Sequence, residues 1–355
     1  LGLAAAALAV PAVAFGQSGT ETPPPPPTES PSPNEIVASA PSGEWVAIDA
    51  EDLVVMTLAP DAQGKIRKVV IQLMPAPFSK GWVENIRTLA RAKWYDGISV
   101  NRVQDNYVVQ WGDPGHDNPE GEGIETKPLP EGLRVMGESE YEVPITEEMR
   151  NDATRNEGKK AGDGPSGWTV YAPGDSNQFE NSRRSSNLFG GDPYAYFNFS
   201  YNGWPISFGS MTHAWPIHCY GMVGVGRGYS PDTGSGAELY TVIGHAPRHL
   251  DRNIALVGRI IEGMEHLSSL PRGSGVLGFY AEDEEDKRTP ILSIDVASDV
   301  GGRDFKFEYL STEGETFARY ADARANRRDP FFIVPAGGAD ICNIPVPVRR
   351  VSTGD

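Results

Sequence analysis

Two polar side chains in apolar stretches, Arg102 and Gln110, are the residues of this chain best placed to do chemistry together. Arg102 lies within a strand-like apolar run, and Gln110 ends the next run, just before a Trp-Gly-Asp sequence. A guanidinium stays charged, presents its donors in fixed directions and tolerates apolar surroundings better than an ammonium. A glutamine amide beside it can both donate and accept hydrogen bonds. In isolation, an arginine on a strand is by default a surface residue, so the role of this pair depends on the sequence blocks that surround it.

Strands are predicted to position this pair, because the apolar stretches of the chain mostly alternate or are short and continuous. The 40 Gly and 30 Pro also favour short strands and turns over long helices. The stretch 98–110 is expected to form a strand, a loop and a strand. The other predicted strands lie at 45–58, 65–73, 218–225, 238–243 and 289–296. Helices are expected at 79–92, with Ser79 as N-cap, and at 260–270, before Pro271.

The order and spacing of two sequence blocks resemble the cyclophilin family of peptidyl-prolyl cis/trans isomerases. The first block contains WYDGISVNRV and QWGD, and the second contains ELYTVIGHAPRHLDRN followed by LVGRIIEG. In the family the corresponding blocks read roughly YDG-x-x-F-H-R-V, Q-x-GD and, later, Q-F-x-I and HLD. The resemblance covers residues 46–300 apart from an insertion. It implies a mainly β fold, an eight-stranded antiparallel β-barrel with two capping helices.

The chemistry that the resemblance implies is rotation about X-Pro peptide bonds. The rotation is slow, with a barrier of about 20 kcal/mol, because amide resonance must be broken as the bond twists. Arg102 matches the family's catalytic arginine, and Gln110 matches the glutamine that orients substrate and arginine. Tyr107 and Val108 match residues that line an apolar slot for the proline ring.

The second block implies further substrate-binding residues, several of them changed from the family pattern. They are the backbone of Gly226 and Arg227, the apolar walls Tyr240 and Leu250, and the replaced positions Glu238 and His249. Tyr240 is also a replacement, since the family has phenylalanine at this position. Glu238 stands where the family commonly has glutamine. A carboxylate there could pair with Arg102 or Arg227 and compete with the substrate. These changes predict activity that is weak or selective for an unusual peptide.

Two main functions are therefore expected for this chain. The first is a peptidyl-prolyl isomerase that assists the folding of exported proteins, with proline-containing polypeptides as substrates. The alternative is a catalytically weak or inactive cyclophilin-fold module that binds peptides or acts as a chaperone in the cell envelope. A structural role in the envelope is a third, weaker option. Neither a cofactor nor a metal is expected. The one candidate metal pair, His245 and His249, is disfavoured because Pro247 breaks the helix that would aim both side chains at one ion.

The charge balance disfavours nucleic acid as a partner. Acidic residues number 48 against 31 basic ones, which gives a formal net charge of −17 in 355 residues. Long-range electrostatics therefore repel phosphate backbones and anionic lipid headgroups.

The N-terminal stretch 1–16 is predicted to be a secretory signal peptide, because an apolar run ends there in Ala12-Val13-Ala14. The run is shorter than the roughly 20 apolar residues that span a membrane, so no membrane span is expected. The signal predicts a periplasmic or secreted protein. Residues 17–42 follow as a Pro-rich linker, in which ETPPPPPTESPSPN at 21–34 is expected to stay extended.

The remaining chain is divided into a cyclophilin-like domain at 43–300 and a C-terminal extension at 301–355. The domain carries a large irregular insertion at 117–215, whose many aromatic residues predict some structure of its own. The extension is expected to contain a short helix at 317–327, preceded by a capping box of Thr312 and Glu315. Cys219 and Cys342 are the two cysteines, and either a disulfide or two buried thiols is possible.

Overall fold

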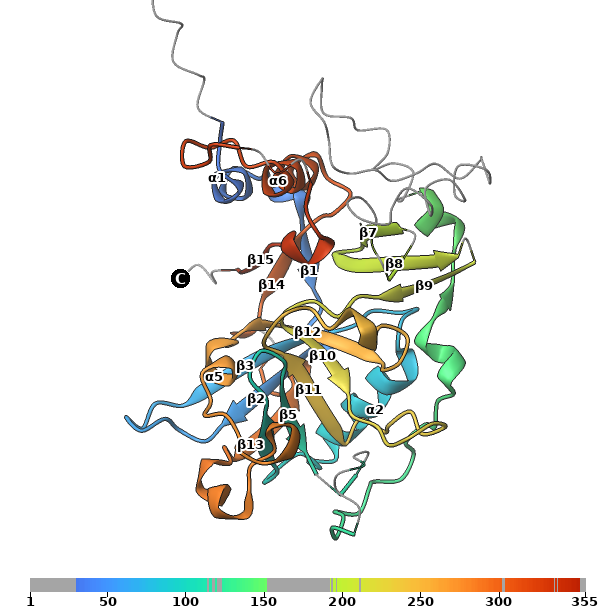
Figure 1. Ribbon diagram of the computed structural model, residues 1–355, viewed down its shortest axis with the longest axis vertical. Helices are drawn as coiled ribbons and strands as arrows, with labels where there is room; N and C mark the ends of the chain where they lie inside the picture. Colours follow the sequence, from blue (N-terminus) through green and yellow to red (C-terminus); the bar gives the residue numbers. More distant parts are fainter. Residues whose placement is uncertain are drawn as a thin grey trace, which may run out of the picture.

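An eight-stranded antiparallel sheet forms the centre of the protein in a computed structural model (Figure 1). The structure describes residues 30–113, 115–116, 119, 123–151, 192, 194–195, 197–210, 212–301, 304–334, 336 and 338–351. The predicted signal peptide at 1–16 lies outside these residues. The strands, in sheet order, are β13 (Ile291–Val296), β2 (Leu53–Leu58), β3 (Arg67–Leu73), β12 (Leu256–Glu262), β10 (Met222–Val225), β11 (Glu238–Val242), β5 (Val108–Gly112) and β4 (Ser99–Val103).

The two edges of this sheet meet and nearly close it into a barrel. Ser99 forms an antiparallel bridge with Pro290, and Ile291 N–H donates to the Ile98 carbonyl at 2.8 Å. Val100 N–H likewise donates to the Thr289 carbonyl at 2.9 Å. Pairing of the edges satisfies backbone groups that an open sheet would expose. The expected mainly β, eight-stranded antiparallel barrel is therefore confirmed.

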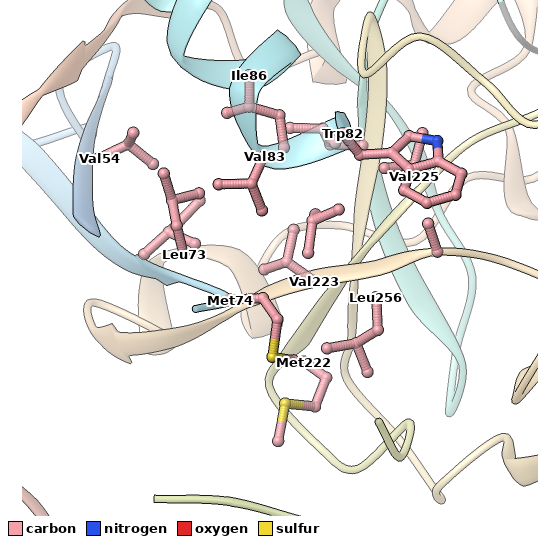
Figure 2. Close-up of a cluster of buried hydrophobic side chains, with 14 of the residues drawn as sticks. Val54, Leu73, Met74, Trp82, Val83, Ile86, Met222, Val223, Val225 and Leu256 are labelled. Carbon is pink, nitrogen blue, oxygen red and sulfur yellow. The ribbon is translucent and has the colours of Figure 1, made fainter. Parts of the chain in front are cut away.

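The barrel core is covered at one end by helix α2 (Lys80–Arg91), which confirms the helix predicted at 79–92. Trp82, Val83 and Ile86 of α2 lie in one buried cluster with the strand residues Leu73, Val223 and Val225 (Figure 2). Burial of such side chains contributes about 1.5–3 kcal/mol each. The N-cap is indeed Ser79, but its backbone is left-handed at φ 48° and its side chain makes no capping hydrogen bond.

The second helix, predicted at 260–270, is wrong over its first half. Ile260 lies in β12 and pairs with Ile71 of β3. A single short helix, α5 (Glu265–Ser268), follows. Gly263 separates the two elements with φ 84°, and a Cβ there would lie 2.2 Å from the Lys68 carbonyl oxygen. The close approach requires glycine and ends the strand at this point.

The strand predicted at 45–58 is divided between two sheets. Residues 45–48 form β1 (Trp45–Ile48), and β2 begins only after a short 3₁₀ turn, Ala50–Asp52. The Asp49 side chain accepts a hydrogen bond from Glu51 N–H at 2.9 Å and caps this turn. This local bond redirects the chain between two apolar runs that look continuous in sequence.

The insertion carries a sheet of its own in its described part. The strand order is β6-β9-β8-β7, made of β6 (Val143–Pro144), β9 (His213–Pro216), β8 (Trp204–Ser210) and β7 (Phe197–Tyr201). Phe199, Trp204, Phe208 and Trp215 are buried. The aromatic side chains thus leave water by packing in this sheet, which agrees with the structure expected for part of the insertion.

The C-terminal extension joins the N-terminal segment in a separate layer (Figure 1). The strands β14 (Phe307–Leu310) and β15 (Val348–Arg350) form a sheet with β1 in the order β1-β14-β15. Helix α6 (Glu315–Ala325) packs on α1 (Pro33–Ala38) through Ile36, Phe317 and Tyr320. A short helix in the extension is confirmed, but its N-cap is Gly314 and the predicted capping box does not form. Instead, Thr312 Oγ1 donates to Glu313 at 2.6 Å.

Helix α1 lies inside the stretch 17–42 that is predicted to be a linker, so that boundary is wrong. Ser32 and Glu35 form a capping box, in which Ser32 N–H donates to the Glu35 carboxylate at 2.7 Å. The box starts a helix directly after the proline-rich run, with Pro33 in the first turn. None of the helices among the described residues has the length and apolarity to cross a membrane.

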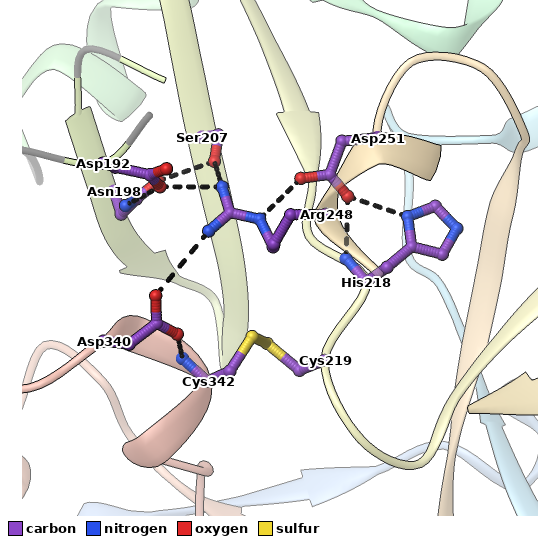
Figure 3. Close-up of a disulfide and its surroundings, with 9 residues drawn as sticks. All are labelled: Asp192, Asn198, Ser207, His218, Cys219, Arg248, Asp251, Asp340 and Cys342. Atoms are coloured by element: carbon purple, nitrogen blue, oxygen red, sulfur yellow. Dashed lines mark hydrogen bonds and ion pairs between the residues drawn. A yellow bond between two sulfur atoms is a disulfide. The ribbon is translucent and has the colours of Figure 1, made fainter. Parts of the chain in front are cut away.

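Cys219 and Cys342 form a disulfide that ties the extension to the barrel (Figure 3). Their Cα atoms lie 5.1 Å apart, within the usual range for a disulfide. Of the two alternatives left open by the sequence, the structure contains the bonded form.

Candidate active site

The Arg102 side chain lies on β4 directly opposite Gln110 of β5, so the pair predicted from the sequence is brought together. Arg102 Nη1 donates to Gln110 Oε1 at 3.0 Å, and Nη2 donates to Gln104 Oε1. Arg102 Nε donates to the Leu277 carbonyl at 2.7 Å. Partners from separate segments therefore fix the plane and direction of the guanidinium.

Two aromatic rings also contact the guanidinium. The Arg102 Cζ atom lies 5.2 Å from the centre of the Phe279 ring and 5.8 Å from the centre of the Tyr107 ring. Both distances are within the range of cation–π attraction. The rings hold the cation while leaving it half-buried at the surface of the barrel.

Glu238 fixes the orientation of Gln110. Its Oε1 atom accepts hydrogen bonds from Gln110 Nε2 at 2.9 Å and from Asn101 Nδ2 at 2.8 Å. Because the amide nitrogen of Gln110 faces this carboxylate, its oxygen faces Arg102. Glu238 is completely buried. Glu238, a predicted substrate-binding residue, thus supports Gln110. The hydrogen bonds run from Arg102 to Gln110 and from Gln110 to Glu238.

The apolar residues predicted for the proline slot come together beside this pair. Val108, Tyr240 and Val242 form a small buried cluster, distinct from the barrel core, and Tyr107 and Leu250 pack against it. Side chains alternate between the two faces of a strand, so Val109 and Trp111 enter the barrel core while Val108 and Gln110 face this cluster. The strand period therefore places an apolar surface next to the fixed cation.

Tyr240 carries a hydroxyl where the family has phenylalanine, and the structure accommodates it. The hydroxyl is hydrogen-bonded to His218 Nε2 at 2.9 Å. A Cβ on Gly224 would lie 2.3 Å from this oxygen, so the glycine makes room for it. Burial raises the pKa of Tyr240 well above its ordinary value, which keeps the phenol neutral. His218 in turn bonds Asp251 through Nδ1 at 2.8 Å.

The other predicted substrate-binding residues make contacts within the protein. His249 is exposed and stacks on Tyr107, with ring centres 6.4 Å apart. Gly226 N–H donates to the Glu238 carbonyl at 2.7 Å, which belongs to the sheet. The Arg227 side chain donates to the Asn253 carbonyl at 2.8 Å. Contact of these groups with a bound peptide stays a prediction.

The sequence gives little signal for several residues that contact the site. Gln104, His218, Leu277 and Phe279 all touch Arg102 or Tyr240. Leu277 and Phe279 lie in an irregular segment with no periodic pattern, far from Arg102 in the chain. Among the described residues, no group of three or more His, Cys, Asp or Glu side chains could hold a metal ion.

Replacing Glu238 with alanine is expected to lower both stability and activity. The change leaves the buried amides of Asn101 and Gln110 without their shared acceptor, which costs about 1–3 kcal/mol per unsatisfied group. Gln110 also loses the partner that sets its orientation. Urea unfolding and kcat/KM on a proline peptide measure the two effects. The exposed Glu131→Ala variant is the control, and equal behaviour of the two variants would contradict the supporting role.

Comparisons with known proteins identify the family of this chain. The model of the cyclophilin type peptidyl-prolyl cis-trans isomerase/CLD family matches residues 63–296. A solved cyclophilin from Hirschia baltica has 19% identity and a TM-score of 0.55, covering 91% of this chain and 98% of its own. A cyclophilin-type isomerase from Cryptosporidium parvum has 12% identity and a TM-score of 0.34, covering 68% and 96%. No curated protein matches the sequence. Because the family model spans most of the chain and the fold is the expected barrel, this protein belongs to the cyclophilin-type peptidyl-prolyl cis-trans isomerase family.

Proposed function

We propose that this protein isomerises X-Pro bonds with Arg102 as the group that stabilises the twisted amide. The observation that supports the proposal is a guanidinium held beside an apolar cluster, with Gln110 and Leu277 as its hydrogen-bond partners. The cluster of Val108 and Tyr240, with Tyr107 against it, offers a surface for a proline ring.

The mechanism requires no covalent intermediate. As the C–N bond twists, resonance is lost and the electron pair returns to the proline nitrogen, which becomes a better acceptor than in the planar amide. An Arg102 N–H that donates to this nitrogen stabilises the twisted state more than either planar isomer. Because partners within the protein already fix the guanidinium, little reorganisation accompanies the reaction.

The direct test is cis/trans exchange of a proline-containing tetrapeptide, followed by NMR line shapes and by a protease-coupled assay. We expect the protein to accelerate exchange well above the uncatalysed rate. Exchange at the uncatalysed rate in both assays would reject the proposed activity.

A binding module with little turnover is the second candidate. It is favoured by the hydrogen bonds that Arg102 makes within the protein, with which a substrate must compete. In that case the protein would bind an unfolded, proline-containing chain with an affinity that survives Arg102→Ala, and exchange of the tetrapeptide would stay at the uncatalysed rate.

We further infer that the protein works on exported chains in a periplasmic or secreted setting. The support is the Cys219–Cys342 disulfide, since such bonds persist mainly in oxidising compartments. Fractionation of producing cells, with thiol alkylation of each fraction, tests this idea. The oxidised protein should be found outside the cytoplasm, and a reduced protein confined to the cytoplasm would exclude export.

Removal of the disulfide is expected to destabilise the protein. The two cysteines are separated by 123 residues, so the bond closes a long loop and restricts the unfolded chain. The double variant Cys219→Ser/Cys342→Ser should lose about 2–4 kcal/mol of unfolding free energy. Urea unfolding of the variant and of the parent, with and without reductant, measures the loss. The variant should show no response to reductant, and a parent that is equally insensitive would contradict the prediction.

A further inference from the structure

A segment far from Arg102 in the sequence, residues 273–281, lies directly against it. Phe279 forms an isolated antiparallel bridge with Arg102, and Tyr280 N–H donates to the Asn101 carbonyl at 3.1 Å. Gly273 N–H donates to the Val103 carbonyl at 3.1 Å at the other end of the segment. The segment is therefore docked along β4, and its middle carries the Leu277 carbonyl that accepts from Arg102 Nε.

The backbone at Leu277 is in an unfavourable conformation. Leu277 has φ 55° and the next residue, Gly278, has φ 82°, so two successive residues are left-handed. This region is costly for a residue with a branched apolar side chain, and the Leu277 side chain is 46% exposed, so it gains little from burial. Such a conformation persists only where the surrounding structure holds it. The cause must therefore lie in the contacts of the segment.

The turn at Leu277 is closed by its own backbone, since Gly275 N–H donates to the Phe279 carbonyl at 2.9 Å and Phe279 N–H donates to the Val276 carbonyl at 3.1 Å. Glu284 ties the two ends of the segment together outside this turn. Its Oε2 atom accepts hydrogen bonds from Ser274 N–H at 2.9 Å and Ala281 N–H at 3.1 Å. Its Oε1 atom pairs with Lys287 Nζ at 2.6 Å. The bond to Lys287 and the two backbone bonds lower the pKa of Glu284 to about 2, so it is ionised at neutral pH. It is buried, whereas its neighbours Glu282, Asp283, Glu285 and Asp286 are exposed.

The geometry points to Glu284 as a positioning residue of the isomerase: by tying Ser274 to Ala281, it holds the Leu277 carbonyl against Arg102. This inference rests on the role of Arg102 proposed above. Glu284 does not touch the substrate slot and acts only through the segment. A fixed Leu277 carbonyl at Nε–H restrains rotation of the planar guanidinium about its Cδ–Nε bond, so the remaining N–H groups keep one direction.

The first experiment reads the hydrogen bond itself by NMR. Exchange of the Arg102 Nε–H with water is measured in the full protein, and the resonance is assigned from its absence in Arg102→Lys. In Glu284→Ala the exchange should become about 10-fold faster or more, as expected when a hydrogen bond of ordinary strength no longer protects the proton. In the matched control Glu285→Ala, which removes an exposed acid one position away, the rate should not change. Equal exchange in Glu284→Ala and the parent overturns the inference, whatever the catalytic activity.

The second experiment uses kinetics. Glu284→Ala should lower kcat for the tetrapeptide about 10-fold with a smaller change in KM, because the slot is intact while the cation is misplaced. Glu284→Gln should recover most of the loss, since its amide oxygen can still accept both backbone N–H groups. In the Arg102→Ala background, Glu284→Ala should add no further loss of kcat.

If Arg102→Ala lowers kcat and Glu284→Ala does not, the inference about Glu284 fails while the proposed function stands. If Arg102→Ala has the parent's activity, the proposed function fails. The exchange rate of the Arg102 Nε–H then still shows whether Glu284 holds the Leu277 carbonyl against Arg102. An equal loss from Glu284→Ala in both backgrounds assigns Glu284 a merely structural role and overturns the inference.

Discussion

The Arg102→Ala variant is expected to lose about 100-fold or more of kcat/KM for a proline tetrapeptide, the usual cost of removing a preorganised donor from an active site. The structure gives the physical reason. The guanidinium is fixed by Gln110, Gln104 and the Leu277 carbonyl. It also lies near the ring of Tyr107, which packs against the apolar cluster. Removal of the side chain beyond Cβ takes away the donor but leaves the cluster of Val108 and Tyr240 in place. The loss should therefore fall mainly on kcat.

Two further variants make this prediction specific. Arg102→Lys retains the charge but has a single ammonium in place of the planar donor group, so it should also be strongly impaired. Arg91→Ala, which removes an exposed arginine of α2 paired with Glu51 and Asp299, is the control and should keep the parent's activity. Stopped-flow kinetics at several substrate concentrations separate kcat from KM. Full activity of Arg102→Ala would show that the guanidinium does not act in the reaction.

The sequence predicts the parts of the site that lie on regular strands. Arg102, Gln110 and Val108 are spaced by the alternation of β4 and β5, and the barrel brings Tyr240 beside them. A period of two residues is readable in one sequence because it reflects local geometry. The strands predicted within 98–110 and 238–243, which carry these residues, therefore agree with β4, β5 and β11.

The remaining parts depend on contacts that no local pattern encodes. Leu277 reaches Arg102 across 175 positions, and its left-handed backbone lies in a turn whose ends are tied together by Glu284. Ile260 begins a helix-like run, but its pairing with Ile71 makes it a strand residue. In each case a distant partner overrides the local preference. The support that Glu238 gives to Gln110 also depends on the fold, because β11 and β5 bring the two side chains together.

One buried arginine, Arg248, links the insertion and the C-terminal extension to the barrel (Figure 3). It pairs with Asp251 at 2.7 Å and with Asp192 of the insertion at 2.8 Å. Asp340, next to the disulfide-bonded part of the extension, lies 3.9 Å away. Although burial opposes the charge, Asp251 and Asp192 raise the pKa of Arg248 above its ordinary value. The same Asp251 orients His218, which bonds the Tyr240 hydroxyl, so the network reaches from the added segments to the apolar slot.

The Arg248→Met variant is therefore expected to lose about 3–5 kcal/mol of unfolding free energy, the usual cost of leaving buried charges without their partner. Methionine fills much of the volume, so the loss measures the unpaired Asp251 and Asp192 carboxylates rather than a cavity. Equilibrium unfolding in urea gives the free energy. The control is Arg252→Met, whose half-exposed arginine pairs with Glu142 at 3.6 Å and should cost no more than about 1 kcal/mol. If both variants unfold at the same urea concentration, Arg248 does not join the insertion to the barrel.

If Arg248→Met is destabilised as expected, KM for the tetrapeptide should also rise, because His218 and the wall residue Tyr240 lose their fixed support.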